Sequence, residues 1–472
     1  MQISENTINK NFIPVSDYSK VEKQYWHYKF EVKSPVIVLD DDPTGIQTVH
    51  GIPVYMSWKK DVLEAIFKNK QLAFIHTNTR AYKPEQVRVI LGEIMKNVIE
   101  VSKETGQDYE IICRGDSTIR GHYPLETDFI REIIEKDTSK KIDGEIICPF
   151  FKEGGRVTVN DIHYVKNRDN YIPSSETEFA KDPDFGYKNS DLKKWIEEKT
   201  EGQYKSEDVI SISLDLLRKE KKEDIISRLN QAENFSKIIV NAFEYNDLMT
   251  FIPALLDIQA KGKKFLFRTA ASFVKTYGFI KDKDFLTGKD LSIEKSENKS
   301  ILLIAGSYTG KTSSQLNQLM KEHDVIPIEI NVKKLLVGEK SFHEEIKEKT
   351  AKTDKLIAGK KNPVLFTSRE LIKTTDHLQT AETISSALIN IVNSLKNRPA
   401  VVIAKGGITS SVIGVQGLKI SKAMVEGQII PGVPVIIAGE ESKWPGIPYV
   451  IFPGNVGNED SLSEVYTSVL AG

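Results

Sequence analysis

The sequence of 472 residues has only two cysteines, Cys113 and Cys148, each inside an apolar run. Two thiols cannot build a disulfide framework, and neither has a Cys or His neighbour at the spacing of a zinc site. This pattern favours free, buried thiols in a reducing compartment. No apolar run approaches the roughly 20 residues of a transmembrane helix, and residues 1–12 lack the apolar core of a signal peptide. We therefore expect a cytoplasmic protein without membrane segments.

An excess of charge of either sign is also absent. The chain has 65 Lys and Arg against 66 Asp and Glu, which gives a formal net charge of −1. This balance provides no global attraction to nucleic acid or to a membrane surface, so we expect neither as a partner. Hydrophobic residues make up 40% and charged residues 28%, which is typical of globular chains. At about 100–200 residues per domain, the length predicts two or three domains.

Short β-branched runs alternate with longer amphipathic segments from residue 34 onward. Strands are predicted at 36–40, 72–76, 110–113, 145–148, 209–213, 237–240 and 264–267, and then at 301–305, 325–330, 364–367, 401–404, 433–438 and 449–452. Helices are predicted at 84–103, 123–135, 216–232, 247–261, 313–323, 381–395 and 459–469. Nearly continuous apolar strands separated by helices are typical of a parallel sheet covered on both faces. The pattern therefore predicts an α/β fold.

A polar stretch at 279–300, rich in Lys, Asp, Glu and Ser, indicates a domain boundary. We expect two α/β domains, each a mostly parallel sheet flanked by helices, with the active site in the cleft between them. The expected parts are an N-terminal extension (1–33), a first domain (34–285), a linker (286–299) and a second domain (300–472). Residues 150–184 interrupt the alternation and predict a loop or β-hairpin excursion, and such excursions often cover active sites.

Three carboxylates, Asp40, Asp41 and Asp42, follow the first predicted strand in the sequence D-D-D-P-T-G. Ligands of open α/β sheets bind beyond the carboxyl ends of the strands. Adjacent carboxylates repel one another, and this cost is tolerated mainly where a cation or substrate hydroxyls compensate for it. A solvated turn with an Asx cap is the alternative. The position at a strand end favours a functional site.

A second polar motif, R-G-D-S-T-I-R-G-H, follows the strand at 110–113. Arg114 and Arg120 flank Asp116, so the arginines could pair with a substrate carboxylate while Asp116 accepts a hydroxyl proton. The alternative is an internal Arg–Asp salt bridge that caps a helix. Asn78 and Arg80 follow another strand and could line the same site. The sequence F-R-T-A-A-S-F, which begins at Phe267, adds further polar groups at a strand end.

The second domain has glycines at its strand ends in place of charges. The turns are I-A-G-S-Y-T-G-K-T (304–312), K-G-G-I-T-S (405–410) and P-G-N-V-G (453–457). Each exposes backbone amides at a helix N-terminus, where an anion is favoured. Three such turns, with Lys311 and Lys405, indicate a nucleotide-phosphate site. The first turn also approximates a P-loop in which Ala305 replaces the first glycine, so a P-loop NTPase that uses Ala305–Thr312 is an alternative.

Five motifs occur in a fixed order: D-D-x-T-G (41–45), R-G-D-S-T-x-R-G (114–121), G-S-x-T (306–309), K-G-G-x-T-S (405–410) and P-G-N-V-G (453–457). Together they resemble the four-carbon acid sugar kinase family from about residue 36 to the C-terminus. The resemblance implies an enzyme that uses ATP, with Mg²⁺ expected, to phosphorylate a hydroxyl of a small sugar acid such as threonate, erythronate or 3-oxo-tetronate. Its N-terminal domain would bind the sugar acid and its C-terminal domain the nucleotide.

The resemblance also assigns residues to each ligand. The sugar-acid contacts that it implies are Asp41, Asp42, Arg114, Asp116 and Ser117, to which the strand-end positions add Arg120, Asn78 and Arg80. The ATP contacts are Ser307, Thr309, Gly406, Gly407, Ile408, Thr409, Gly454, Asn455 and Gly457. Either Asp116 or Asp42 would accept the hydroxyl proton, and the sequence assigns no metal ligand.

Two departures leave the exact sugar acid undefined. The first motif of the family usually continues with an aromatic residue and then a helix of small residues, whereas here Pro43 follows Asp42 and the residues 46–48 (I-Q-T) follow Gly45. Residues 150–184 also enlarge the substrate side. A second alternative to the kinase is a two-domain sensor that binds a sugar acid without chemistry. The sequence does not determine the oligomeric state, and a homo-oligomer is compatible with it.

Overall fold

The computed structural model describes residues 3–4, 18–42, 44–219, 222–306, 309–368, 377–454 and 456–471. The chain divides into two compact units. Unit 1 consists of Met1–Gly45 and Ser57–Lys281, and unit 2 consists of Ile46–Met56 and Asp282–Gly472. Both units contain β-strands flanked by helices, which confirms the predicted α/β fold.

The main sheet of unit 1 is parallel throughout its described strands. In spatial order, the strands are β10 (Ile210–Ile212), β11 (Ser236–Val240), β6 (Gly144–Cys148), β12 (Phe265–Thr269), β5 (Glu110–Arg114), β2 (Val36–Asp40) and β4 (Leu72–His76). Every residue of β2, β4, β6 and β12 is buried, so both faces of the sheet are covered. Because the strands run in one direction, their carboxyl ends lie along one edge.

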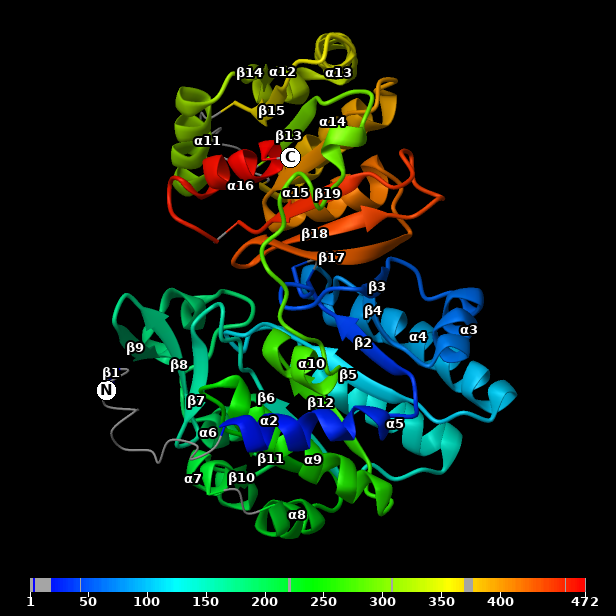
Figure 1. Ribbon diagram of the computed structural model, residues 1–472, viewed down its shortest axis with the longest axis vertical. Helices are drawn as coiled ribbons and strands as arrows, with labels where there is room; N and C mark the ends of the chain where they lie inside the picture. Colours follow the sequence, from blue (N-terminus) through cyan, green and yellow to red (C-terminus); the bar gives the residue numbers. More distant parts are fainter. Residues whose placement is uncertain are drawn as a thin grey trace. The chain divides into compact units, whose positions relative to one another are not determined.

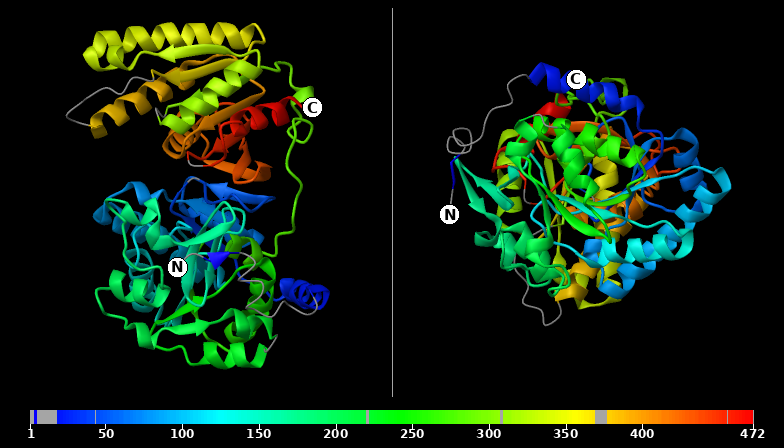
Figure 2. Two further views of the ribbon diagram at one scale, coloured as in Figure 1. Left: turned by 90° about the vertical axis from the view of Figure 1, so that its left-hand side faces the viewer. Right: turned by 90° about the horizontal axis from the view of Figure 1, so that it is seen from below.

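Two groups of helices pack around this sheet (Figure 1). The first contains α3 (Lys60–Asn69), α4 (Pro84–Thr105) and α5 (Leu125–Thr138), and the second contains α2 (Tyr18–His27), α7 (Leu214–Arg218), α8 (Lys222–Asn230), α9 (Tyr245–Ala260) and α10 (Ala271–Tyr277). A further helix, α6 (Leu192–Lys199), contacts β11. Figure 2 shows α2, in dark blue, on the outside of unit 1, where it packs on α9.

The sequence of α4 shows why these helices form where they do. Pro84 occupies the first helical position, where its fixed φ is favourable and its missing N–H costs nothing. The helix ends at Gly106, which adopts φ 63° in the left-handed region. Val87, Leu91 and Val98 recur at helical spacing and are buried, so one face of α4 packs on the unit.

The predicted excursion after β6 forms a small antiparallel sheet in unit 1. Its strands are β7 (Arg156–Val159), β8 (Ile162–Asn167) and β9 (Asn170–Pro173), and the short β1 (Ile3–Ser4) pairs with β9. Two short 3₁₀ turns follow, at Ser174–Glu176 and Glu178–Lys181. The hairpin interpretation of residues 150–184 is therefore confirmed.

Unit 2 has a mixed sheet. In spatial order, its strands are β3 (Ile52–Tyr55), β17 (Lys422–Ile430), β18 (Val433–Ala438), β19 (Pro448–Phe452), β16 (Val401–Lys405), β13 (Ile301–Ala305), β15 (Pro363–Thr367) and β14 (Ile326–Ile330). The strands from β19 to β14 are parallel, whereas β3, β17, β18 and β19 pair antiparallel. The helices are α11 (Gly310–Glu322), α12 (Val332–Val337), α13 (Glu339–Ala358), α14 (His377–Ser394), α15 (Gly407–Val412) and α16 (Ser461–Leu470).

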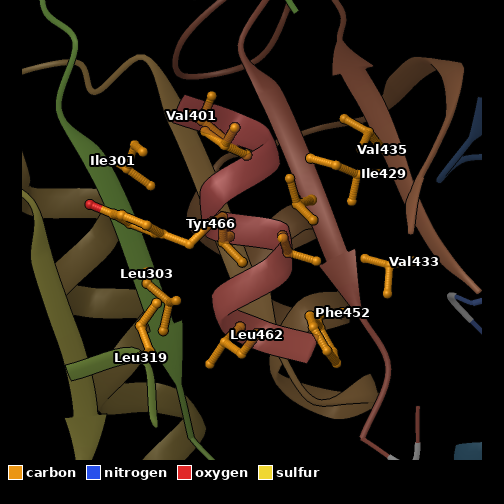
Figure 3. Packing of buried hydrophobic residues seen from close by; sticks show 14 of the residues in the cluster. Ile301, Leu303, Leu319, Val401, Ile429, Val433, Val435, Phe452, Leu462 and Tyr466 are labelled. Atoms are coloured by element: carbon orange, nitrogen blue, oxygen red, sulfur yellow. The ribbon is translucent and has the colours of Figure 1, made fainter. Parts of the chain in front are cut away.

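The core of unit 2 lies between its sheet and helix α16. Figure 3 shows Leu462 and Tyr466 of α16 packed near Ile301 and Leu303 of β13, with Leu319 of α11 beside them. These five side chains are at most 2% exposed. Removing this apolar surface from water supplies the main driving force for folding of the unit.

The stretch predicted as a linker, residues 286–299, packs onto unit 2. Leu286 and Leu291 are buried in the core of unit 2, and the Leu286 amide donates to the carbonyl of Gln428. The first predicted domain also requires a correction, because residues 46–56 belong to unit 2, where β3 pairs with β17. The many charged residues of this stretch indicated a boundary, but they did not reveal that Leu286 and Leu291 are buried in unit 2.

A buried ion pair joins neighbouring strands of unit 1. Lys237 Nζ lies 2.5 Å from Glu145 Oε2, and neither side chain is exposed to solvent. The rings of Phe235 and Tyr204 surround the ammonium at 4.0 and 4.2 Å. If one partner is removed, water therefore cannot reach and solvate the charge that remains.

We expect Lys237→Met to lower the free energy of unfolding of unit 1 by about 3–5 kcal/mol, because Glu145 would stay buried without a cation beside it. The midpoint of urea unfolding measures this change. The double variant with Glu145→Gln removes the uncompensated charge and should recover part of the loss. A single variant within about 1 kcal/mol of the parent chain would contradict the assignment.

Candidate functional site

Polar side chains gather at the carboxyl-end edge of unit 1, beyond the neighbouring strands β12, β5, β2 and β4. We call this group the carboxylate–arginine cluster: Asp40, Asp41, Asp42, Asp116, Glu126, Arg80, Arg114, Arg120 and Arg268. The backbone connects the loops that carry these residues. The Asp41 amide donates to the carbonyl of Arg114, and the amides of Thr77 and Asn78 donate to the carbonyl of Asp40.

Arg80 joins three carboxylates of the cluster. Its Nη2 and Nε lie 2.5 and 3.2 Å from the two oxygens of Asp41, and its Nη1 lies 3.3 Å from Asp42 Oδ2 and 3.9 Å from Asp116 Oδ1. Burial would raise the pKa of Asp42, but Arg80 and the Thr44 hydroxyl outweigh it and lower that pKa. Asp42 is therefore ionised at neutral pH, and its side chain is 23% exposed.

Arg114 lies beneath this layer. Its side chain is only 4% exposed, and its Nη1 is 3.3 Å from Asp40 Oδ1 and 4.0 Å from Asp41 Oδ1. Burial, with further contributions from Asp41 and Asp42, raises the pKa of Asp40 to about 8 despite the attraction of Arg114. Asp40 therefore carries a proton at neutral pH, which reduces the repulsion among the three successive aspartates.

The loop after β5 holds Asp116 at the centre of the cluster. Arg120 Nε lies 2.8 Å from Asp116 Oδ2, and the Thr118 hydroxyl donates to the same oxygen. Burial would raise the pKa of Asp116, but Arg80 and Arg120 together lower it well below its usual range. Ile119 adopts φ 59°, which is strained for a β-branched residue, and such strain is typical of functional loops.

Glycines let this loop lie directly over Arg268. A Cβ atom on Gly115 would approach the Arg268 guanidinium to 2.3 Å, and one on Gly121 would approach it to 2.8 Å. Arg268 uses the space to pair with Glu126 at 2.7 Å and to donate to the carbonyl of Arg120. Any side chain at Gly115 would therefore displace either the Arg268 guanidinium or the loop that carries Asp116.

The excursion supports the same loop from the side. His163 of β8 is buried, and its Nε2 lies 2.7 Å from the Ser117 carbonyl oxygen. Burial lowers the pKa of His163 to about 4, so the ring is neutral at physiological pH. The carbonyl only accepts, so Nε2 carries the proton and Nδ1 accepts from the Thr158 hydroxyl at 3.0 Å. Asp182 adds a carboxylate 3.2 Å from Arg120 Nη1.

In unit 2, the glycine turns follow three neighbouring parallel strands, β13, β16 and β19. A Cβ on Gly306 would lie 2.7 Å from the hydroxyl of Thr409, so the first two turns touch. Gly406 adopts φ 110° and its amide donates to the carbonyl of Phe452, which brings the second turn to the third. The backbone groups of the three turns are therefore collected at one edge.

Side chains hold the 453–457 turn by its carbonyl oxygens. Lys405 Nζ donates to the carbonyls of Pro453 at 2.8 Å and Gly454 at 3.3 Å. Lys311 Nζ lies 3.2 Å from the carbonyl of Gly457. Gln315 Nε2 donates to the carbonyl of Val456 at 3.3 Å. These three side chains therefore fix the carbonyl oxygens of the turn.

Lys405 is fully buried and its ammonium lies over the Phe452 ring at 4.3 Å. Burial, reinforced by the charge of Lys311, lowers the pKa of Lys405 to about 7. A nearby phosphate would reverse this effect, because a negative charge favours the protonated lysine. Lys405 is therefore placed to respond to an anion at the 453–457 turn.

The other predicted nucleotide contacts vary in exposure. Thr409 is buried beside Gly306, Ile408 is 72% exposed, and nothing lies within 4 Å of a Cβ built on Gly407 or Gly454. Thr309 caps α11, because its hydroxyl accepts from the amide of Thr312. Ser307 and Asn455 lie outside the described residues.

Two family models match the chain. The first, described as a sugar-binding N-terminal domain, matches residues 36–277. The second, described as a nucleotide-binding C-terminal domain, matches residues 302–462. The chain belongs to the four-carbon acid sugar kinase family. The resemblance drawn from the five ordered motifs is therefore confirmed.

Two solved structures are similar to this four-carbon acid sugar kinase family member, and the first of them supports its fold. A suspected tRNA synthase from Salmonella typhimurium LT2 is 14% identical, with a TM-score of 0.65 over 91% of this chain and 97% of that one. A domain of unknown function (DUF1537) from Bordetella bronchiseptica, solved with citrate as a domain-swapped dimer, is 16% identical over 93% of this chain and 99% of that one, with a TM-score of 0.38. None of the curated proteins matches the sequence.

The structure brings together the two polar motifs of the sugar-binding domain, residues 40–45 and 114–121. Their positions at the carboxyl ends of neighbouring parallel strands predict this. The Asp41 amide donates to the Arg114 carbonyl and so joins them, and Asn78, at φ 53°, donates its amide to the carbonyl of Asp40. Sequence reasoning did not select Asp182, Glu126 or Gln315. Their residue types and spacing match no ligand motif, and only the folded loops show what they contact. The polar residue at the end of β12, Arg268, was visible in the sequence as a strand-end signal.

No helix among the described residues is long and apolar enough to cross a membrane. Nor do three or more His, Cys, Asp or Glu side chains in the described ranges form a group that could hold a metal ion.

Proposed function

We propose that this chain is an ATP-dependent kinase that phosphorylates a hydroxyl of a small sugar acid of the tetronate type, such as threonate, erythronate or 3-oxo-tetronate. One observation carries the proposal. Paired carboxylates and arginines occupy the strand ends of the sugar-binding domain, and glycine turns occupy those of the nucleotide-binding domain. The first set suits hydroxyls and a carboxylate, and the second suits phosphates.

In unit 1, the proposed sugar-acid contacts divide by charge. Asp41, Asp42 and Asp116 would accept hydrogen bonds from substrate hydroxyls, as ionised carboxylates do. Arg80 and Arg120 hold these carboxylates in place. Arg114 acts on the substrate through Asp40 and Asp41, which it contacts. The proposed roles of Ser117 and Asn78 are to add polar contacts at the same edge.

In unit 2, the backbone amides at 407–409 and 454–457 would bind the triphosphate, while the Gly406 amide donates to the carbonyl of Phe452. The γ-phosphoryl group then passes in line to the sugar-acid hydroxyl, a reaction in which positioning and charge neutralisation matter more than covalent chemistry. Asp116 or Asp42 would orient that hydroxyl and accept its proton. The low pKa of both carboxylates fits a proton transfer that follows most of the bond breaking to the γ-phosphorus.

Magnesium is expected to accompany ATP. Mg²⁺ in kinases is bound through substrate phosphates and one or two carboxylates, so a complete protein cage is not required. Asp42 fits this need best, because it is ionised and 23% exposed, whereas Asp41 is 3% exposed and fully paired with Arg80. The metal would neutralise charge on the transferring phosphoryl group.

The position of Lys311 separates the proposed kinase from a P-loop NTPase. A P-loop lysine contacts the β- and γ-phosphates, so its loss should abolish activity. Here Lys311 Nζ contacts the carbonyl of Gly457, and Gln315 Nε2 donates to the neighbouring carbonyls of Val456 and Asn458. We expect Lys311→Ala to lower kcat/KM for ATP by about tenfold or less in an ADP-release assay. A loss above about 10³-fold would favour the P-loop alternative.

An ADP-release screen over sugar acids of three to six carbons tests the proposed function. We expect turnover with at least one four-carbon acid and none without the acid. Thermal stabilisation by ATP would count against a sensor that binds only the sugar acid. If no sugar acid supports ADP release while ATP still stabilises the chain, the proposed kinase activity is wrong.

A further inference from the structure

We propose that Arg156, on the first strand of the excursion, binds the carboxylate of the sugar acid and so selects acids over neutral polyols. This inference rests on the proposed function. Arg156 belongs to none of the five sequence motifs, and β7 places it beside the carboxylate–arginine cluster. The argument depends on its partners, its burial and the charges around it.

The backbone fixes where Arg156 lies. Its amide and carbonyl exchange hydrogen bonds with Phe151 at 2.9 and 3.0 Å, and it pairs with Val165 across β7 and β8. The guanidinium carbon lies 5.7 Å from the centre of the Phe179 ring. Arg120 lies over the same ring at 5.2 Å. One aromatic ring therefore holds two guanidinium groups next to Asp116.

The two arginines differ in their partners. Arg120 pairs with both Asp116 and Asp182. Among the described residues, Arg156 pairs with no carboxylate, although each of the other four arginines of this region does. Its Nη1 donates to the carbonyl of Gly154, and its buried Nε has no hydrogen-bond partner within the described structure.

A partly buried guanidinium whose Nε is buried without a partner is costly when no anion lies beside it. Burial lowers the pKa of Arg156, and the charge of Arg120 adds to this effect, while Asp116 and Glu178 oppose it only in part. An anionic ligand would supply the missing charge and accept from the free Nε. The planar fork of arginine matches a carboxylate, which makes the acid group of the substrate the fitting partner.

This assignment also orients the substrate. With its carboxylate at Arg156, the chain of a sugar acid would extend toward Asp116, whose charge interacts with that of Arg156. The hydroxyls would then face Asp116 and Asp42. A neutral polyol would leave Arg156 without an anion and should bind less tightly.

The test compares Arg156→Met and Arg156→Lys with the parent chain on L-threonate and D-erythronate, and on threitol and erythritol as neutral analogues. We expect Arg156→Met to raise KM for the acids by about 10- to 150-fold, with KM for ATP and the activity on polyols changed less than about threefold. Arg156→Lys keeps the charge without the fork and should show an intermediate KM. Arg88→Met is the matched control, because Arg88 also lies over a phenylalanine ring, Phe129, at 5.0 Å.

Equal losses on acids and polyols, or an unchanged KM for the acids, would overturn the proposal. Thermal stabilisation by the acids without ATP decides the question independently of turnover. The parent chain and Arg88→Met should be stabilised and Arg156→Met should not. If the acids stabilise the parent chain but are never phosphorylated, the kinase assignment is wrong and Arg156 is still tested. If neither acid stabilises the parent chain, Arg156 is not a carboxylate site for these acids. If Arg156→Met does not fold, the KM of Arg156→Lys decides.

Discussion

Replacing Asp116 by Asn should lower kcat for sugar-acid phosphorylation by on the order of 10³-fold, because a proton acceptor of this kind contributes roughly 10²–10⁴-fold. Asn keeps the size of the side chain and removes its charge. Arg80 and Arg120, 3.9 and 2.8 Å from the carboxylate, would then repel each other without the anion between them. The loss therefore combines missing proton transfer with a displaced loop.

Steady-state kcat and KM on the best sugar acid from the screen measure this effect. Asp182→Asn is a matched control, since Asp182 also pairs with Arg120, at 3.2 Å. We expect that control to retain at least a tenth of the parent kcat. If Asp116→Asn also retained a tenth, Asp42 would become the candidate base, and Asp42→Asn would then have to show the large loss.

The second large effect is expected at Lys405. Lys405→Met should lower kcat/KM for ATP by about 10²–10³-fold, a size typical of removing a preorganised charged donor. The variant would leave the carbonyls of Pro453 and Gly454 without their donor and would remove a cation from the glycine turns. Lys443→Met is the control, because Lys443 also donates to a carbonyl and lies over a ring, that of Trp444. A Lys405→Met loss no larger than that of the control would contradict this role.

Lys405 also predicts how ATP binding depends on pH. Burial and the charge of Lys311 lower its pKa to about 7, so the ammonium loses its proton above that pH when no nucleotide is bound. Bound phosphate raises the pKa again, so ATP binding takes up a proton between pH 7 and the pKa of the complex. KM for ATP should therefore be flat below pH 7 and rise above it. In Lys405→Met, this rise should disappear between pH 6 and 9.

The strands were the most predictable part of the fold. Residues 36–40, 72–76, 301–305 and 433–438 are strands with the predicted ends, because each is a short continuous apolar run that is largely buried. β17 was missed because its buried residues alternate with exposed ones. The predicted helix 216–232 is divided into α7 and α8.

The candidate site was predictable at the level of motifs and not of contacts. Parallel strands bring their carboxyl ends to one edge, so the convergence of Asp41, Arg80 and Asp116 follows from the order of the strands. Which guanidinium meets which carboxylate depends on loop conformation, such as the left-handed Ile119. Arg156 could not be selected from its sequence neighbours, because the observation that matters is the absence of a carboxylate partner among the described residues.

The assignment of residues 46–56 to unit 2 has a consequence for how the chain folds as it is synthesised. β3 leaves the ribosome early, whereas its partner β17 is translated after the whole of unit 1. The strands of unit 1 can therefore pair with one another before β17, the partner of β3 in unit 2, has been synthesised. For the same reason, a fragment that starts at Asp282 would leave the edge of β17 open, and open edges favour aggregation. Producing the nucleotide-binding unit in isolation would require supplying residues 46–56 with it.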